Sequence, residues 1–278
     1  MKKISRNIFS LKERVVIITG GAGLLGEKHA EAIAEFGGIP VLLDVNFEEA
    51  LIKADKVAKK YDTICKAYHC DITDLNNISK TKNSIVEKFG RIDVLINNAA
   101  IDPKMGSDGS GRSFSRLEFF SLLQWNQEIN VGLTGAFLCT KVFGSYMAEN
   151  SGGTIINISS DLGIIAPDQR LYRKEKLKEE AQAVKPITYS VIKHGLIGLT
   201  KYTATYWVEK GVRANALCPA GVYTNQADEF VQKISNLIPM GRMANVDEYK
   251  GAIVFLASDA SSYMNGAILI IDGGRTIW

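Results

Sequence analysis

Short apolar runs alternate along the chain with longer segments that mix apolar and charged residues. A run that is hydrophobic almost throughout is typical of a strand covered on both faces, and a longer amphipathic segment is typical of a helix. The alternation therefore predicts βαβ units around a parallel sheet, with helices on both faces. The seven expected strands are 15–19, 39–44, 65–69, 92–96, 154–159, 213–218 and 267–271.

No internal linker or repeat interrupts this rhythm, so we expect one domain over residues 1–278. Two segments depart from it. Residues 102–116 are rich in glycine and serine and predict a flexible loop, and residues 161–186 form a charged insertion that predicts a helical lid with a solvated face. The expected helices are 25–36, 47–60, 74–89, 117–148, 187–210, 225–236 and 246–257.

Composition excludes several classes of protein. Of the 278 residues, 46% are hydrophobic and 23% are charged, as in ordinary globular proteins. A net charge of +3 is too small to indicate a nucleic-acid or membrane partner, and no apolar run approaches the ~20 residues of a membrane span. The four cysteines are scattered and the three histidines lack metal-ligand spacing, so we expect free thiols, no metal and a cytoplasmic location.

A glycine-rich turn follows the first expected strand. Thr19-Gly20-Gly21-Ala22-Gly23-Leu24-Leu25-Gly26 runs directly into a helix, and such a turn lets a pyrophosphate lie on the N–H groups of the helix N-terminus. Asp44 ends the next strand, close to the spacing of about 20 residues expected for an acid that binds a ribose. Because Asp44 would repel a 2′-phosphate and neither Val45 nor Asn46 supplies a cation, NAD is favoured over NADP.

A tyrosine and a lysine are the candidate acid–base pair. Tyr189 and Lys193 stand four residues apart and therefore share one helix face. A free tyrosine has a pKa of about 10, and a neighbouring cation lowers that pKa and brings the phenol into range for proton transfer. Ser160, at the end of the strand 154–159, can hold a reacting carbonyl or alcohol beside it.

A second tyrosine and lysine, Tyr172 and Lys176, have the same spacing within the insertion. Their neighbours are mostly charged, which predicts a solvated helix face. Tyr189 instead begins a helix of small and apolar residues that can pack on a sheet and reach a cofactor. We therefore assign the chemistry to Tyr189.

Together these motifs resemble the short-chain dehydrogenase/reductase family, over nearly the whole chain. Further likenesses are Asn97-Asn98-Ala99-Ala100, Asp71-Ile72-Thr73, the segment from Pro219 to Thr224, and Asp272-Gly273-Gly274. The resemblance implies a doubly wound Rossmann-type sheet of seven parallel strands in three α/β/α layers. It also implies an NAD-dependent oxidoreductase that interconverts an alcohol and a carbonyl on a small polar substrate. The catalytic residues it implies are Asn130, holding a relay water, and Ser160, Tyr189 and Lys193.

The cofactor contacts are implied by the same resemblance and extend over much of the chain. They are Gly20, Gly23, Leu25, Gly26, Asp44, Asp71, Ile72, Asn98, Ala99, Tyr189, Lys193, Pro219, Val222 and Thr224. The family's habit of pairing through its long central helices implies a homodimer or homotetramer, through residues 117–148 and 187–210.

Three departures from the family pattern leave alternatives open. The position of Gly23 matches the extended branch that acts on sugar nucleotides, so an epimerase or dehydratase is a second candidate. Alanine stands at positions 100 and 220 where the family has glycine. The insertion also separates Ser160 from Tyr189 by many more residues than in the family. A protein that binds NAD as a sensor, without turnover, is a third candidate.

The substrate is open as well. Residues 161–186 and 225–240 are placed to cover the catalytic edge, and the insertion carries more basic than acidic residues. It is either a solvated lid without substrate contact or a source of cations, such as Arg170 and Arg173, that guide a polar or phosphorylated sugar. A narrower likeness to the family's flagellin-modification members would place that sugar in flagellin-glycan biosynthesis.

Overall fold

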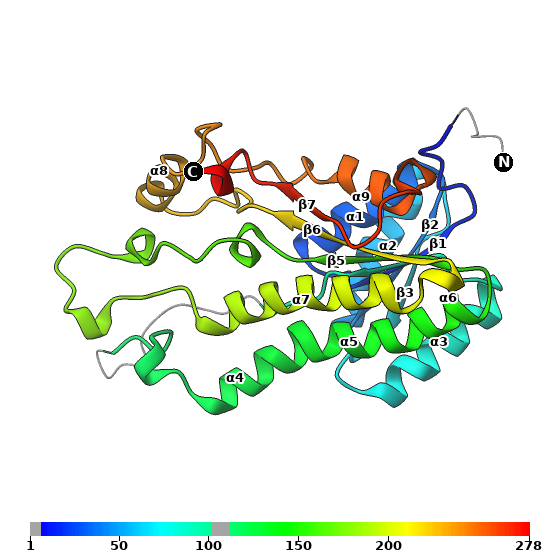
Figure 1. Cartoon of the computed structure of the whole chain (residues 1–278), viewed down its shortest axis with the longest axis horizontal. Helices are drawn as coiled ribbons and strands as arrows, with labels where there is room; N and C mark the ends of the chain where they lie inside the picture. The colour runs from blue at the N-terminus through cyan, green and yellow to red at the C-terminus, as the bar shows by residue number, and fades with distance from the viewer. Residues whose placement is uncertain (1–6, 102–111) are drawn as a thin grey trace.

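The computed structural model describes residues 7–101 and 112–278, so most of the predicted loop 102–116 lies outside the described residues. A seven-stranded parallel sheet forms the centre of the molecule, with helices on both faces (Figure 1). The strands are β1 (Val15–Thr19), β2 (Ile39–Asp44), β3 (Lys66–His69), β4 (Val94–Asn97), β5 (Gly153–Ile158), β6 (Val212–Pro219) and β7 (Ile268–Ile271). Their order is β3-β2-β1-β4-β5-β6-β7, which is a doubly wound Rossmann-type arrangement in one α/β domain. The predicted fold class is confirmed.

Helices cover the two faces of the sheet in two separate hydrophobic layers. The helices are α1 (Leu24–Glu35), α2 (Phe47–Tyr61), α3 (Leu75–Phe89), α4 (Leu122–Ile129), α5 (Gly135–Cys139), α6 (Ser145–Glu149), α7 (Ile187–Tyr206), α8 (Asp228–Ser235) and α9 (Lys250–Ala257). On β1, Val16 and Ile18 pack in the layer of α1, α2 and α9, whereas Val15 and Ile17 pack in the layer of α3, α5 and α7. Both faces of the strand are therefore buried, as its continuous hydrophobicity predicts.

The long helix predicted over 117–148 begins later and is not regular. Residues Leu117–Phe119 form a separate 3₁₀ turn, and α4 starts after Ser121, whose hydroxyl accepts a hydrogen bond from the Gln124 N–H. Two π-helical turns, Asn130–Thr134 and Thr140–Gly144, join α4, α5 and α6. A π-helical turn rotates the side chains that follow it relative to a regular α-helix. Such turns are frequent at functional sites.

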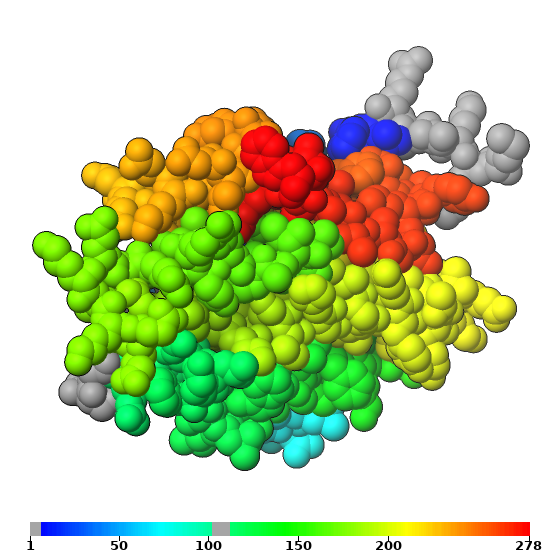
Figure 2. Space-filling view, turned by 60° about the vertical axis from the view of Figure 1, so that its left-hand side comes forward, coloured from blue at the N-terminus to red at the C-terminus, as the bar shows by residue number. Residues whose placement is uncertain are grey.

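The insertion 161–186 is not a helical lid, and this prediction was wrong. It contains three short 3₁₀ turns, Asp161–Gly163, Gln169–Tyr172 and Glu179–Ala181. The buried amide of Gln182 explains the difference, because it bonds to the backbone of Lys174 and Leu177 and competes with helical hydrogen bonds. Figure 2 shows the insertion, in light green, at the surface beside the α8 region, in orange.

Three other helix boundaries also differ from the prediction. Helix α8 starts at residue 228 rather than 225 because Asn225 has a left-handed φ of 60°. Helix α9 starts at residue 250 rather than 246, after a turn in which the Glu248 carboxylate accepts from the Asn245 N–H. Helix α7 ends at Tyr206, and a 3₁₀ turn, Val208–Lys210, follows it. In the part of the chain that the structure describes, no helix is long and apolar enough to cross a bilayer.

Candidate active site

The glycine-rich turn after β1 is closed so tightly that side chains have no room. A Cβ on Gly20, which has a φ of +64°, would lie 2.7 Å from the Ala99 Cα, and a Cβ on Gly26 would lie 2.3 Å from the Gly20 carbonyl oxygen. The turn ends at Gly23, the residue that caps the N-terminus of α1. As at the start of any α-helix, the first N–H groups of α1 have no acceptor within the helix. A bare backbone loop before a helix N-terminus fits the pyrophosphate of a dinucleotide.

Strand β4 holds this turn from the side. The Thr19 hydroxyl accepts hydrogen bonds from the N–H groups of Asn98 and Ala99, at 3.0 and 3.1 Å. The Asn98 side-chain amide donates to the carbonyls of Thr19, at 2.9 Å, and Gly20, at 3.1 Å. Asn98 and Ala99 therefore fix the shape of the turn. The sequence analysis did not assign Thr19 this role, because its contacts are made across the sheet.

Asp44 lies at the rim of the same turn. Its carboxylate accepts from the N–H groups of Ala22 and Asn46, both at 2.9 Å. A cation that the sequence analysis overlooked stands on the other side of Ala22. The Lys53 ammonium donates to the Ala22 carbonyl at 2.7 Å and lies 3.4 Å from the Glu27 carboxylate. The rim therefore carries both an acid and a cation, and the cation is already bound by protein groups.

Two of the expected cofactor contacts, Asp71 and Ile72, follow β3, which lies beside β2. The Asp71 carboxylate accepts from the N–H and the hydroxyl of Thr73, at 2.8 and 2.7 Å, which closes a tight turn. Ile72 is buried, and its side chain packs directly against Gly135 of α5. A Cβ on Gly135 would lie only 2.7 Å from the end of the Ile72 side chain. The turn after β3 is thus anchored on the long central helix.

The remaining expected cofactor contacts lie near the same edge of the sheet. Leu25 is in the first turn of α1, and Pro219 ends β6. Val222 forms an isolated parallel bridge with Ala244, and Thr224 is exposed. Because the carboxyl ends of parallel strands meet at one edge, the segments that follow β1 and β6 lie at the same edge of the sheet.

Tyr189 and Lys193 are brought together in the first two turns of α7. The Lys193 ammonium lies 5.6 Å from the centroid of the Tyr189 ring and donates to the Ile158 carbonyl at 2.9 Å. Lys193 is buried and Tyr189 is half-buried. Burial, together with the positive charge of Lys185, lowers the pKa of Lys193 to about 8. Tyr189 and Lys193 therefore share one face at the start of α7, with the ammonium on the buried side.

The end of β5 is tied to α7 and to the C-terminus. The Ser159 hydroxyl donates to the Lys193 carbonyl at 2.7 Å, and the Ser160 hydroxyl donates to the Asp161 carboxylate at the same distance. Asp161 also forms an ion pair of 2.6 Å with Arg275, and both side chains are buried. Ser160 is thus oriented by a charge pair that the sequence analysis did not predict.

Asn130 begins the first π-helical turn and is exposed. This turn packs very closely on α7, since a Cβ on Gly132 would lie only 2.9 Å from the Ile192 side chain. Ile192 precedes Lys193, so Asn130 stands on the helix that packs against the Tyr189 and Lys193 turn.

Tyr172 does not lie on a solvated helix face, and that part of the prediction was wrong. Its ring is half-buried, with its centroid 5.8 Å from that of Phe230, and burial raises its pKa to about 12. Lys176 is exposed and has a left-handed φ of 65°, so the two residues do not share a helix face. Tyr172 is a poor proton-transfer group, for a different reason from the one predicted.

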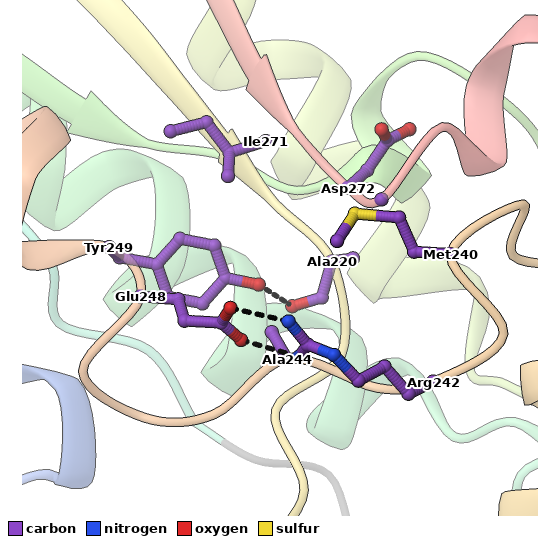
Figure 3. A pocket seen from close by; sticks show the side chains of 9 residues that line it. Ala220, Met240, Arg242, Ala244, Glu248, Tyr249, Ile271 and Asp272 are labelled. Carbon is purple, nitrogen blue, oxygen red and sulfur yellow. Dashed lines mark hydrogen bonds and ion pairs between the residues drawn. The ribbon is translucent and has the colours of Figure 1, made fainter.

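A small cavity of about 140 Å³ opens beside Ala220 (Figure 3). The Tyr249 hydroxyl donates to the Ala220 carbonyl at 2.9 Å, and Arg242 and Glu248 pair across the cavity at 2.6 Å. Burial raises the pKa of Tyr249 well above its usual range. The cavity is too small for a dinucleotide, and its polar groups are already paired, so it supports the segment after β6 rather than forming the reaction site.

Two family models match the chain and together cover most of it. The model described as "short chain dehydrogenase" matches residues 14–172, and the one described as "Enoyl-(Acyl carrier protein) reductase" matches residues 177–276. The two matches meet inside the insertion, which is the segment that departs from the family pattern.

Individual relatives are similar over nearly their whole length. The NADP-dependent mannitol dehydrogenase of Alternaria alternata is 34% identical over 98% of this chain and 96% of its own. The D-threitol dehydrogenase of Mycolicibacterium smegmatis is 31% identical over 97% of this chain and 95% of its own. A gluconate 5-dehydrogenase structure from Burkholderia cenocepacia, in complex with NADP and tartrate, has a TM-score of 0.84 at 27% identity, over 98% of both chains. The chain therefore belongs to the short-chain dehydrogenase/reductase family of oxidoreductases.

Proposed function

We propose that this protein oxidises a secondary alcohol of a polyol or sugar to the carbonyl, and reduces it back, with NAD(P) as the hydride acceptor and donor. The observation that carries the proposal is the Lys193 ammonium beside the Tyr189 ring, bound to the Ile158 carbonyl at the end of β5, two residues before Ser160. The closed glycine turn and Asp44 fit the cofactor, and Tyr189 and Lys193 are its expected neighbours on the nicotinamide side.

Each catalytic side chain has a task that its surroundings support. In oxidation, the Tyr189 phenolate takes the proton of the substrate hydroxyl, and in reduction the phenol returns it. The positive charge of Lys193 stabilises the phenolate. The substrate hydroxyl gives its one proton to Tyr189, so Ser160 can assist only by turning its own O–H from the Asp161 carboxylate to the substrate oxygen. The Ser160 oxygen already accepts from the Leu162 N–H at 3.2 Å, which holds the side chain in place for that turn. The bound nicotinamide supplies the hydride chemistry, and Asn130 is proposed to hold a relay water.

NAD is the proposed cofactor, and NADP the less favoured one. The Asp44 carboxylate at the rim of the glycine turn repels a 2′-phosphate, and the nearby Lys53 is bound by the Ala22 carbonyl and by Glu27. Two of the three relatives above are named with NADP, so this preference rests on the local charges alone.

Polyols and sugar acids are the proposed substrates because the relatives named above act on mannitol, threitol and gluconate. Sugar phosphates are a further candidate. Arg170 and Arg173 are exposed but paired with Asp168 and Glu179, so a phosphate would have to compete with those carboxylates. A place in flagellin-glycan biosynthesis rests on the sequence resemblance only.

A screen of polyols, sugar acids and sugar phosphates with NAD⁺ and NADP⁺, read as absorbance of the reduced cofactor, tests the proposal. Tyr189→Phe should abolish turnover while leaving cofactor binding near normal. Tyr172→Phe is the matched control, since it removes the same hydroxyl from the second tyrosine–lysine motif, and it should keep most of the turnover. Retained turnover in Tyr189→Phe would contradict the catalytic assignment.

The same screen separates the two alternatives. An epimerase or dehydratase of sugar nucleotides would keep its cofactor bound with no net reduction, and a sensor would bind it with no product. In the described residues all seven strands join one sheet, and the relatives above that match over nearly the whole chain are named dehydrogenases, which favours the oxidoreductase.

A homodimer or homotetramer is proposed as well. Apolar side chains on the long central helix and on α7 are exposed, which is unusual for a face that meets only water. They are Leu122, Leu123, Phe137, Val191, Tyr202 and Tyr206. Light scattering after gel filtration measures the mass, and a monomer at micromolar concentration would contradict this proposal.

A further inference from the structure

The insertion brings a second cation to the catalytic phenol. The Lys185 ammonium lies 3.9 Å from the centroid of the Tyr189 ring, which is closer than the 5.6 Å of Lys193. A cation at this distance over an aromatic face is attracted to the ring, and it favours ionisation of a phenol. Tyr189 therefore lies within reach of two ammonium groups, one from α7 and one from the segment before it.

Several contacts hold the backbone of Lys185 in place. Its N–H donates to the side-chain oxygen of Gln169 at 2.8 Å, and the Gln169 amide donates back to its carbonyl at 3.4 Å. The preceding Val184 N–H donates to the Ser115 hydroxyl at 3.1 Å. The following residue, Pro186, is buried, caps α7 and has a ring that restricts its φ. The insertion thus presents Lys185 from a fixed point of the chain.

This placement has a local electrostatic cost. Lys185 stands just before the N-terminus of a 20-residue helix, where the helix dipole disfavours a cation. It also repels Lys193, and this repulsion contributes to the lowered pKa of that residue. Two cations around one phenol become favourable when the phenol is an anion. Residues that break a local rule in this way are often found at functional sites.

We propose that Lys185 is a positioning residue that stabilises the Tyr189 phenolate, so that the insertion tunes the acid–base step. This inference rests on the proposed function. Two further ionisable groups in the described residues interact with the phenol directly, Lys193 beside the ring and Tyr172 through its electrostatic field. The groups next to those two are the buried pair Asp161 and Arg275 and the carboxylate of Asp168 around Tyr172, and Cys218 near Lys193. Glu128 accepts from the hydroxyl of the adjacent Thr188.

A second cation is useful because burial, the larger cause of the lowered pKa of Lys193, acts on that residue whether or not Lys185 is present. The Lys193 ammonium is buried, and with a pKa of about 8 it becomes neutral in the alkaline range. Lys185 is half-buried, so its side chain loses less contact with water than the buried Lys193. We expect Lys185 to extend the pH range over which the phenolate has a positive neighbour.

The test measures ionisation of Tyr189 without any substrate. Tyrosine labelled with ¹³C at the hydroxyl-bearing ring carbon is incorporated, and the Tyr189 signal is assigned by its absence in Tyr189→Phe. Lys185→Met removes the charge, and Lys185→Arg keeps it. Lys178→Met is the matched control, because it removes the same charge from an exposed position of the same insertion.

The ionisation midpoint should rise by on the order of one pH unit in Lys185→Met and stay near the wild-type value in the other two variants. The acid limb of the kcat/KM profile for alcohol oxidation should move to higher pH in parallel. An unchanged midpoint in Lys185→Met, or an equal rise in Lys178→Met, overturns the inference. If Lys185→Met does not fold, Lys185→Gln serves for the same comparison. Absence of turnover with every substrate would refute the proposed function and leave the measured midpoint intact.

Discussion

Replacement of Arg275 by methionine would leave the Asp161 carboxylate buried without its cation. The two side chains are 6% and 3% exposed, and their charged atoms are 2.6 Å apart. Breaking a buried pair by removing one partner costs about 3–5 kcal/mol, because the remaining charge stays out of water. For a chain of this size, a loss of that order lowers the thermal midpoint by roughly 6–20 °C.

The chain contains a matched control for this substitution. Arg242 and Glu248 are also 2.6 Å apart, but their side chains are 46% and 38% exposed. Exposed pairs contribute about 0–1 kcal/mol, so Arg242→Met should be nearly neutral. The two substitutions remove the same chemical group, and Arg242 makes more hydrogen bonds to its carboxylate than Arg275 does, so a larger loss in Arg275→Met points to burial rather than to the number of bonds.

Chemical denaturation of both variants, followed by circular dichroism, measures the difference in free energy of unfolding. The double variant Asp161→Asn with Arg275→Met should recover part of the loss, because no buried charge is then left alone. Equal losses in Arg275→Met and Arg242→Met would refute the reasoning from burial. Arg275→Met should also lower kcat more than it raises KM, because the Asp161 carboxylate orients the Ser160 hydroxyl at 2.7 Å.

Three further predictions concern the phenol, the cofactor rim and a buried histidine. Tyr189→Phe should lower kcat by about 10²–10⁴-fold in a steady-state assay, the usual contribution of an acid–base group, with unchanged NADH fluorescence titration. Asp44→Ala should narrow the ratio of kcat/KM between NADH and NADPH, and an unchanged ratio would contradict the ribose role. Burial lowers the pKa of His29 from 6.5 to about 3, so its neutral form stabilises the fold and this contribution is lost as pH falls from 6.5 towards 3. Denaturation of His29→Leu at pH 7 and pH 4 should show a smaller acid-induced loss than in wild type, by on the order of a few kcal/mol.

The strands could be predicted from the sequence because hydrophobic burial on two faces leaves a local signature. Each predicted strand agrees with the structure to within two residues. The glycine turn was predictable for a similar reason, since Gly20 and Gly26 stand where a Cβ would collide with backbone. Both features depend on residues that are close in sequence, so a pattern in the chain is enough to reveal them.

The insertion could not be predicted in this way, because its structure depends on single side chains. The Gln182 amide bonds to Lys174 and Leu177, and these bonds replace the helix that the charge pattern suggests. The ion pair of Asp161 and Arg275 joins residues that are 114 positions apart. No periodicity connects such positions, although a charged residue directly after Ser160 was a visible signal.

The dependence on single side chains also explains why the sequence alone gives the insertion no role at the site. In the sequence, Lys185 is one of several cations in a charged stretch, and most such cations are solvated. The structure separates them by their partners: Arg170 and Arg173 pair with carboxylates at the surface, whereas the Lys185 ammonium lies over the Tyr189 ring. A segment that stands out in the sequence only by its charge and length therefore contacts the group on which the proposed chemistry depends. Its length alone would have suggested a peripheral lid, but the contact makes it part of the electrostatic environment of the phenol.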